Sequence, residues 1–152
     1  MKNTVFKGIA TAMITPMTST GVDYDTLERF IEFQIENGIN ALVAVGTTGE
    51  SATLTPEERK AVIRFTVKQV NGRVPVIAGT GTNNTEHVLD FTRCACDDGA
   101  DAVLVVTPYY NKATQGGLLA HYTAVADAAE KPVILYNVPS RTGCNLLPET
   151  VA

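Results

Sequence analysis

Residues able to donate hydrogen bonds or transfer protons follow four apolar segments of the chain. Residues 46–51 (GTTGES), 79–84 (GTGTNN), 107–111 (TPYYN) and 136–143 (YNVPSRTG) each come directly after a short apolar run. Neutral hydroxyl donors beside backbone amides suit a small carboxylate, which accepts several short hydrogen bonds and is favoured by a nearby guanidinium. Arg141 is the candidate guanidinium. Tyrosine hydroxyls linked through a threonine can also pass a proton, as enol or imine chemistry requires.

The same segments do not indicate phosphate binding. Residues 46–49 (GTTG) lack the lysine and the spacing of a Walker loop, and residues 79–81 (GTG) lack the third small residue of a dinucleotide fingerprint. Any one of these loops could be explained by turn formation alone, because Gly, Thr, Asn and Pro favour turns for backbone reasons. Four such loops at one edge of a sheet favour a functional site.

Cysteine and histidine residues do not indicate a metal centre. Cys94, Cys96 and Cys144 form no CxxC pair and have no matching histidine spacing, so we expect neither a disulfide framework nor a metal site, and no cofactor. His87 and His121 lie in helical segments, where a packed or surface role is usual. Cys144 has no histidine in its segment that would activate it as a nucleophile.

The apolar runs recur at a nearly constant spacing. They start at residues 9, 41, 74, 102 and 133, which are 32, 33, 28 and 31 residues apart, and helical patterns lie between them. A complete (β/α)8 barrel of about 250 residues uses about 31 residues for each unit. The sequence therefore predicts an α/β protein of the TIM barrel family, here a partial barrel of about five strands and four helices. The predicted strands are 9–14, 41–45, 74–78, 102–106 and 133–136.

Helix boundaries are marked by capping signals. Residues 55–58 (TPEE) form a capping box with proline at the first helical position. Other helices are predicted from Asp23 to near Gly38 with Phe30 on the buried face, over 85–97, and from about Thr114. A further helix begins at 148–149. A doubly wound sheet shows the same alternation and needs only five strands, but residues 15–18 (TPMT) lack its glycine fingerprint.

Composition limits the functional classes. With 152 residues, 45% hydrophobic and 18% charged, the chain is long and apolar enough for one domain, and we take residues 1–152 as the N-terminal part of a single barrel domain. A net charge of −4 disfavours binding to nucleic acid or to an acidic lipid surface. No segment has the length of a signal peptide or a membrane span, so a cytoplasmic location is expected.

Three motifs together resemble one enzyme family. Residues 46–54 (GTTGESATL), 105–111 (VVTPYYN) and 135–143 (LYNVPSRTG) are similar to the signatures of the 4-hydroxy-tetrahydrodipicolinate synthase (dihydrodipicolinate synthase) family of pyruvate-dependent class I aldolases, and the resemblance covers the whole chain. Sister aldolases such as N-acetylneuraminate lyase share the G-x-T-G-E core. They resemble this chain less in the second threonine and in residues 140–143 (SRTG).

The resemblance implies an activity and a set of roles. In that family, pyruvate forms a Schiff base with a lysine, becomes an enamine and attacks aspartate semialdehyde at the entry to lysine and diaminopimelate biosynthesis. Tyr136 would donate and accept the proton at the imine, and Thr47 would link it to Tyr110. Tyr110 would reach the neighbouring subunit's site across a tight dimer, within the tetramer that is usual in the family. Thr48 would bind the pyruvate carboxylate, and Arg141 the carboxylate of the aldehyde.

The family resemblance also implies a candidate regulatory site for lysine. Its matching residues are Ser51, Ala52, Asn83 and Tyr109. Lysine-sensitive members often have histidines where this chain has Pro56 and Arg59, and a glutamate where it has His87.

The expected nucleophile is not found in this sequence. The family's Schiff-base lysine lies on the strand after Tyr136, about 31 residues later by the barrel period, whereas this chain ends at Ala152. The lysines of this chain are Lys2, Lys7, Lys60, Lys68, Lys112 and Lys131. None of them falls at the C-terminal end of a predicted strand. We therefore expect the chain as given to be inactive. The alternatives are another pyruvate aldolase such as N-acetylneuraminate lyase and a non-catalytic assembly or scaffold fragment. The missing C-terminal portion is an expected partner of the chain. Five strands also leave two free sheet edges, so self-association is expected.

Overall fold

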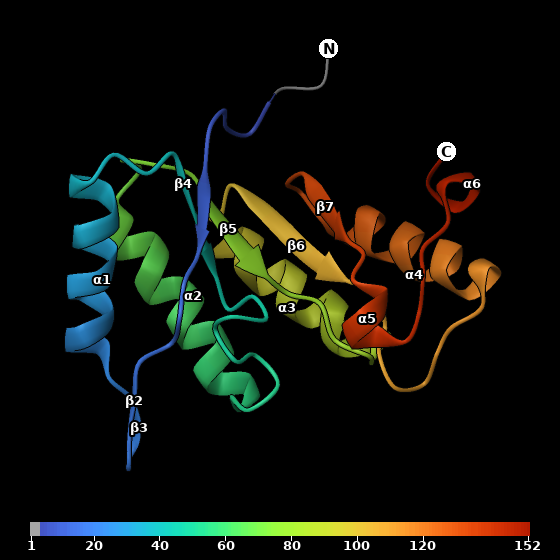
Figure 1. The fold of residues 1–152 in the computed structure, drawn as a ribbon, viewed down its shortest axis with the longest axis horizontal. Coiled ribbons are helices and arrows are strands. Elements are labelled where there is room, and N and C mark those ends of the chain that lie inside the picture. The colour runs from blue at the N-terminus through green and yellow to red at the C-terminus, as the bar shows by residue number, and fades with distance from the viewer. Residues whose placement is uncertain (1–3) are drawn as a thin grey trace.

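A five-stranded parallel sheet forms the centre of the protein (Figure 1). The computed structural model describes residues 4–152. The strands lie side by side in the order in which they occur along the chain: β1 (Ala10–Ala12), β4 (Ala41–Ala44), β5 (Val76–Gly79), β6 (Ala102–Val106) and β7 (Val133–Tyr136). This order confirms the partial barrel. It differs from that of a doubly wound sheet, in which the strand order reverses at a switch point.

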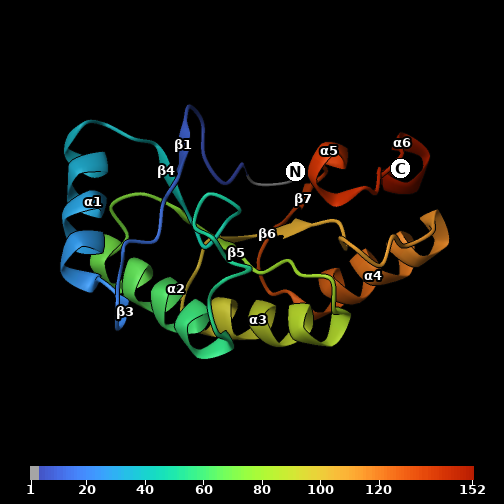
Figure 2. The ribbon, with the colours of Figure 1, turned by 60° about the horizontal axis from the view of Figure 1, so that its bottom comes forward.

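Four long helices connect these strands. They are α1 (Tyr24–Glu36), α2 (Pro56–Val70), α3 (Thr85–Asp97) and α4 (Gln115–Ala128). Figure 2 shows them as an arc along one face of the sheet, as in the outer layer of a barrel. A doubly wound fold would place helices on both faces.

The capping signals read from the sequence are present at the starts of these helices. In α2, the Thr55 hydroxyl accepts from the Glu58 amide at 3.2 Å, and the Glu58 carboxylate accepts from the Thr55 amide at 2.9 Å. The Asp23 carboxylate caps α1, and the Thr114 hydroxyl caps α4. These bonds satisfy amides that have no partner inside the helix.

Three short elements were not anticipated from the sequence. A small hairpin, β2 (Met17–Thr18) and β3 (Gly21–Val22), precedes α1, and α5 (Pro139–Thr142) follows β7. These elements are too short to produce a hydrophobic period. The helix predicted at 148–149 is present as α6 (Pro148–Val151).

Two packing expectations at the β1 edge were wrong. β1 is shorter than the predicted strand 9–14, and Ile9 and Ile14 beside it are 70% and 50% exposed rather than buried. Phe30, expected on the buried face of α1, is 37% exposed. The reason is common to both elements: β1 pairs only with β4, and nothing among residues 4–152 covers its other side.

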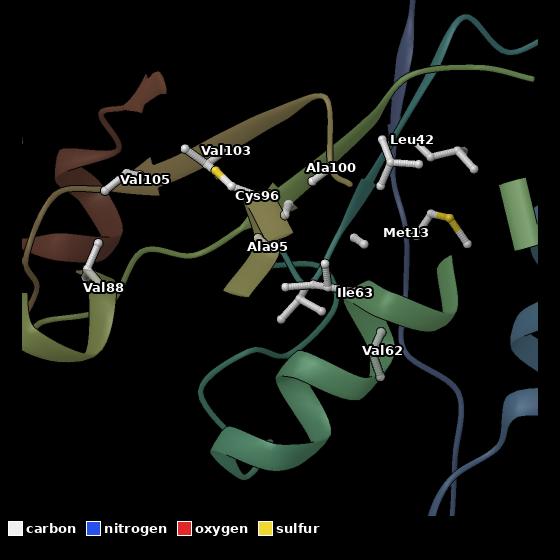
Figure 3. Close-up of a cluster of buried hydrophobic side chains, with 14 of the residues drawn as sticks. Met13, Leu42, Val62, Ile63, Val88, Ala95, Cys96, Ala100, Val103 and Val105 are labelled. Atoms are coloured by element: carbon white, nitrogen blue, oxygen red, sulfur yellow. The ribbon is translucent and has the colours of Figure 1, made fainter. Parts of the chain in front are cut away.

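Side chains alternate between two hydrophobic layers. The larger layer lies between the sheet and the helices, and Figure 3 shows Leu42, Val103 and Val105 in it with residues of α2 and α3. A smaller layer on the opposite face contains Ala41, Ile77 and Ala102. Ile134 of β7 packs against this smaller layer. Because alternate strand residues point to the same face, Tyr136 lies on the same face of the sheet as Ile134, which we call the inner face.

Among residues 4–152, no helix has both the length and the apolar character required to cross a membrane.

Candidate functional site

The polar segments singled out in the sequence lie together at the C-terminal edge of the sheet. Strands β4, β5, β6 and β7 run parallel, so the loops that follow them leave the sheet at the same edge. In α/β folds this is the edge at which ligands bind. Two adjoining clefts lie there.

The first cleft is narrow and lies directly over the strand ends. Its volume is about 20 Å³, roughly the space of one water molecule. Thr47 and Tyr136 both line it, so the sheet brings these two residues to one place. The other lining residues are Val45, Gly46, Ser51, Gly79, Gly81, Leu104 and Val106.

The second cleft is wider and also contains Thr47. Its volume is about 220 Å³, enough for a small organic acid. Arg141 and Glu50 line it, so that a basic and an acidic residue border the same space as Thr47. The remaining lining residues are Ser51, Ala52, Val106, Tyr109, Val138 and Thr142.

Strand register holds Tyr136 at the first cleft. Tyr136 pairs with Val106 at the last position of the β6–β7 ladder, and its backbone carbonyl accepts from the Thr107 amide at 3.1 Å. The backbone is therefore fixed up to the residue that carries the phenol. The alternation of the strand then directs the side chain to the inner face.

Hydrogen bonds from two polar side chains shape the loop that carries Arg141. The Thr142 hydroxyl donates to the Cys144 carbonyl at 2.9 Å and accepts from the Cys144 amide at 3.2 Å. The Asn137 side chain bonds both the amide and the carbonyl of Leu146, at 3.0 and 3.2 Å. Asn137 and Thr142 thus have structural roles that the sequence analysis did not assign to them.

Local backbone strain shapes the loop after β4. Val45, the residue that follows β4, has φ = 56°, in the left-handed region that a β-branched residue rarely adopts. Glu50 has the same φ, and the carbonyl of Gly49 accepts from the buried Thr15 hydroxyl at 2.8 Å. Strained residues of this kind cluster at functional sites. Here they direct the loop so that Thr47 lies at the junction of the two clefts.

Two of the predicted site residues do not join this group within a single chain. Thr48 belongs to the same loop and is exposed, but it lines neither cleft. Tyr110 has φ = 69° and is 89% exposed, and no hydrogen bond joins it to Thr47 within the described residues. The link between Thr47 and Tyr110, which is predicted to form across a dimer, is therefore absent within the single chain described.

The candidate regulatory residues overlap with the second cleft. Ser51, Ala52 and Tyr109 line it together with Arg141. Asn83 lies apart from its lining, where its carbonyl accepts from the Asn111 side chain at 3.2 Å. In this chain the two candidate sites therefore share a wall.

The described lysines lie outside both clefts. Lys60 forms an ion pair with Asp90 at 2.7 Å on the helical layer, and Lys131 precedes β7 at the opposite edge of the sheet. Lys112 follows β6 in the loop at the site edge, but it is exposed and lines neither cleft. Lys2 lies outside the described residues.

One buried cation was not identified from the sequence as part of this edge. Arg59 of α2 is 6% exposed and reaches the carbonyls at the end of β5. The place of an arginine within a predicted helix does not indicate which distant carbonyls its side chain contacts. The histidines are placed as expected: His121 is buried and bonds the Thr85 hydroxyl through Nδ1 at 2.9 Å, and His87 is exposed.

Comparisons with known proteins agree with this geometry. Residues 5–152 match the model of the dihydrodipicolinate synthetase family. The curated 4-hydroxy-tetrahydrodipicolinate synthase of Alkaliphilus oremlandii is 56% identical over 148 residues, which cover 97% of this chain and 51% of that protein. The crystal structure of dihydrodipicolinate synthase from Aquifex aeolicus superimposes with a TM-score of 0.94 at 49% identity, covering 96% of this chain and 50% of that one.

A third relative has been solved with a ligand. The structure of the chloride-inhibited dihydrodipicolinate synthase from Acinetobacter baumannii, complexed with pyruvate, is 52% identical with a TM-score of 0.92 and covers 97% of this chain and 50% of its own. The chain thus spans about half the length of the curated relatives it matches. Its sequence, its strand order and the clefts at its strand ends agree with one another, and the chain belongs to the dihydrodipicolinate synthetase family.

Proposed function

We propose that the protein acts as a 4-hydroxy-tetrahydrodipicolinate synthase and that this chain supplies the proton-transfer and carboxylate-binding half of its site. The observation that carries the proposal is the place of Thr47, which lies in one cleft with Tyr136 and in the adjoining cleft with Arg141. The substrates would be pyruvate and aspartate semialdehyde. The reaction belongs to the lyase class and to lysine and diaminopimelate biosynthesis in the cytoplasm.

Each residue has a chemical task in this proposal. A lysine amine and the pyruvate carbonyl form an imine and release water, and Tyr136 donates and accepts the protons of that exchange. Thr47 relays protons, and Thr48 binds the pyruvate carboxylate. Loss of a methyl proton gives an enamine, whose carbon attacks the aldehyde held by Arg141. The amino group of the aldehyde substrate then attacks the imine carbon, which closes the ring and releases the lysine amine.

The lysine of this scheme is placed on the strand after β7. The described lysines lie outside both clefts, and an amine nucleophile requires a pKa lowered by burial or by neighbouring charge, which exposed lysines rarely have. The proposal therefore expects no pyruvate adduct on the 152-residue chain alone.

The proposed oligomer supplies the remaining hydroxyl. Tyr110 is exposed on a strained loop, as would be expected of a residue that inserts into a neighbouring subunit across a tight dimer. Ser51, Ala52 and Tyr109, with Asn83 nearby, would form the regulatory site for lysine.

The decisive experiment uses a fusion of this chain to the C-terminal half of the Alkaliphilus oremlandii relative. We expect the fusion to consume pyruvate only when aspartate semialdehyde is present. Borohydride reduction with pyruvate should add to the fusion the mass of one pyruvate less the water lost on imine formation and plus two hydrogens, and should add nothing to the chain alone.

Other outcomes would contradict the proposal. Cleavage of N-acetylneuraminate without synthase activity would assign the chain to that sister activity. A folded fusion without adduct or turnover would favour a non-catalytic scaffold. An adduct on the chain alone would show that one of its own lysines serves as the nucleophile.

A further inference from the structure

A buried guanidinium is bonded to the floor of the first cleft from behind. Arg59 extends from α2 towards the end of β5, and its Nη2 donates to the carbonyls of Gly79 and Gly81, at 3.2 Å in each case. Arg59 lines neither cleft. The hydrogen bonds of Arg59 therefore act on the first cleft through the two glycines.

The two carbonyls need this donor because the chain leaves the regular sheet at this point. The amides of Thr80 and Gly81 both donate to the same carbonyl, that of Leu104, at 3.1 and 3.4 Å. The ladder between β5 and β6 ends at the pair of Gly79 and Leu104. Buried carbonyls beyond a ladder cost free energy unless a side chain or water satisfies them. Arg59 satisfies both.

The arrangement is costly, which argues against a role in stability alone. No carboxylate among residues 4–152 forms an ion pair with Arg59, and its buried Nε has no hydrogen-bond partner there. Burial lowers the pKa of the guanidinium, and the Tyr109 phenol opposes that shift. The Phe91 ring, 4.2 Å from the guanidinium carbon, provides the remaining stabilisation. A buried cation without an anion is rarely the most stable choice for a site.

The glycines held by Arg59 are in close contact with the residues that carry the clefts. A β-carbon at Gly79 would overlap the Val45 carbonyl, and one at Gly81 would overlap the Val106 amide. Val45 leads into the loop of Thr47, and Val106 pairs with Tyr136. A shift of the segment 79–81 would therefore move both walls of the first cleft.

We infer that Arg59 is a positioning residue, which sets the separation of Thr47 and Tyr136 by fixing the carbonyls of Gly79 and Gly81. This inference deepens the proposed function and rests on it for the catalytic consequence. The structural part, that Arg59 fixes the segment 79–81, can be tested without any activity.

The first test measures amide hydrogen exchange on the 152-residue chain. In Arg59→Met, which retains much of the side-chain bulk but has no donor, the Thr80 and Gly81 amides should exchange at least tenfold faster. The Leu42 amide, which donates to the Pro75 carbonyl, serves as the internal reference, and its exchange rate should stay within twofold of the parent's. The matched control is Arg64→Met: Arg64 lies on the same helix but is exposed and pairs with Asp98.

The exchange experiment can overturn the inference in two ways. Unchanged exchange at Thr80 and Gly81 would show that Arg59 does not hold the segment. Equal acceleration of all amides, the Leu42 amide included, would show that Arg59 serves overall stability only.

The second test measures kinetics in the active fusion. We expect Arg59→Met to lower kcat about tenfold or more with little change in the KM for pyruvate, because displaced reacting groups cost rate. Arg59→Lys, which keeps a charged donor, should recover part of the loss, and Arg64→Met should match the parent. If the parent fusion is inactive, the proposed function fails while the exchange result stands. If Arg59→Met retains full kcat in an active fusion, the positioning role fails and the proposed function stands.

Discussion

The backbone carbonyl of Val45 packs against the Cα of Gly79 so closely that a β-carbon at position 79 has no room. This contact joins the ends of β4 and β5 beneath Thr47. Val45 is held in the left-handed region at this point, with φ = 56°. The edge that carries the candidate site is therefore built from backbone atoms in direct contact and leaves little freedom for substitution.

Gly79→Ala should destabilise the protein. The added methyl group cannot displace a backbone carbonyl without moving a strand, and overpacking of this kind costs about 1–3 kcal/mol. Urea unfolding followed by circular dichroism measures the change. Gly116→Ala is the matched control: the site in α4 is open, and alanine should stabilise the helix by about 0.5–1 kcal/mol. Equal stability of the two variants would contradict the close contact.

Thr55→Ala should cost about 1 kcal/mol of unfolding free energy, because it removes the hydroxyl that caps α2 and releases the Glu58 side chain. Thermal unfolding gives the measurement. Thr123→Ala, at an exposed position inside α4, is the control and should change stability little. A loss in the control as large as in Thr55→Ala would argue against a capping effect.

Stability should decrease below neutral pH because of His121. Burial lowers the pKa of His121 below its usual 6.5, so the folded state holds the neutral ring while the unfolded chain takes up a proton. The free energy of unfolding should therefore be unaffected above about pH 7 and fall as the pH drops through 6.5. The free energy of unfolding, measured by urea unfolding at several pH values between 7.5 and 5.5, tests this prediction. His121→Gln should flatten the profile, whereas His87→Gln, at an exposed position, should leave it unchanged.

Tyr136→Phe should lower kcat of the fusion about 100-fold or more, in line with the usual contribution of a positioned acid or base. Circular dichroism should show an unchanged fold, because Tyr136 lines the first cleft and belongs to neither hydrophobic layer. Tyr24→Phe is the control: this tyrosine packs against Phe65 on the helical layer, away from the clefts, and should retain full activity. Full activity of Tyr136→Phe would remove Tyr136 from the mechanism.

The 152-residue chain should self-associate through its open β1 edge. Thr11, Met13, Ile14, Phe30 and Phe33 line an apolar groove of about 230 Å³ between β1 and α1, and Phe33 is 58% exposed. Sedimentation should therefore show species heavier than 16.2 kDa. The double variant Ile14→Lys with Phe33→Glu should shift the distribution towards monomer. A parent chain that sediments as a single monomer would contradict the prediction.

Periodicity in the sequence was sufficient to predict the layered fold. The strands 102–106 and 133–136 and the helix 85–97 have the predicted bounds. The capping box at Thr55 was readable because all its partners lie within four residues. Hydrophobic period and local hydrogen bonds are properties of short segments.

The site itself was predicted only in part. The sequence placed Thr47, Tyr136 and Arg141 at one edge, since parallel strands end together, and the family resemblance supplied their proposed roles. It did not show that Thr47 stands between two clefts. That position depends on strand register and on the strained backbone at Val45.

The amino-acid sequence by itself determined the order of elements, the family and the edge at which polar groups gather, because those properties follow from local pattern and motif. Only the tertiary structure decided that Arg59 is buried against Gly79 and Gly81, 20 and 22 residues away, and that Phe30 is exposed. Contacts between distant segments depend on how helices and strands pack, and packing is a property of the whole assembled chain rather than of any segment within it.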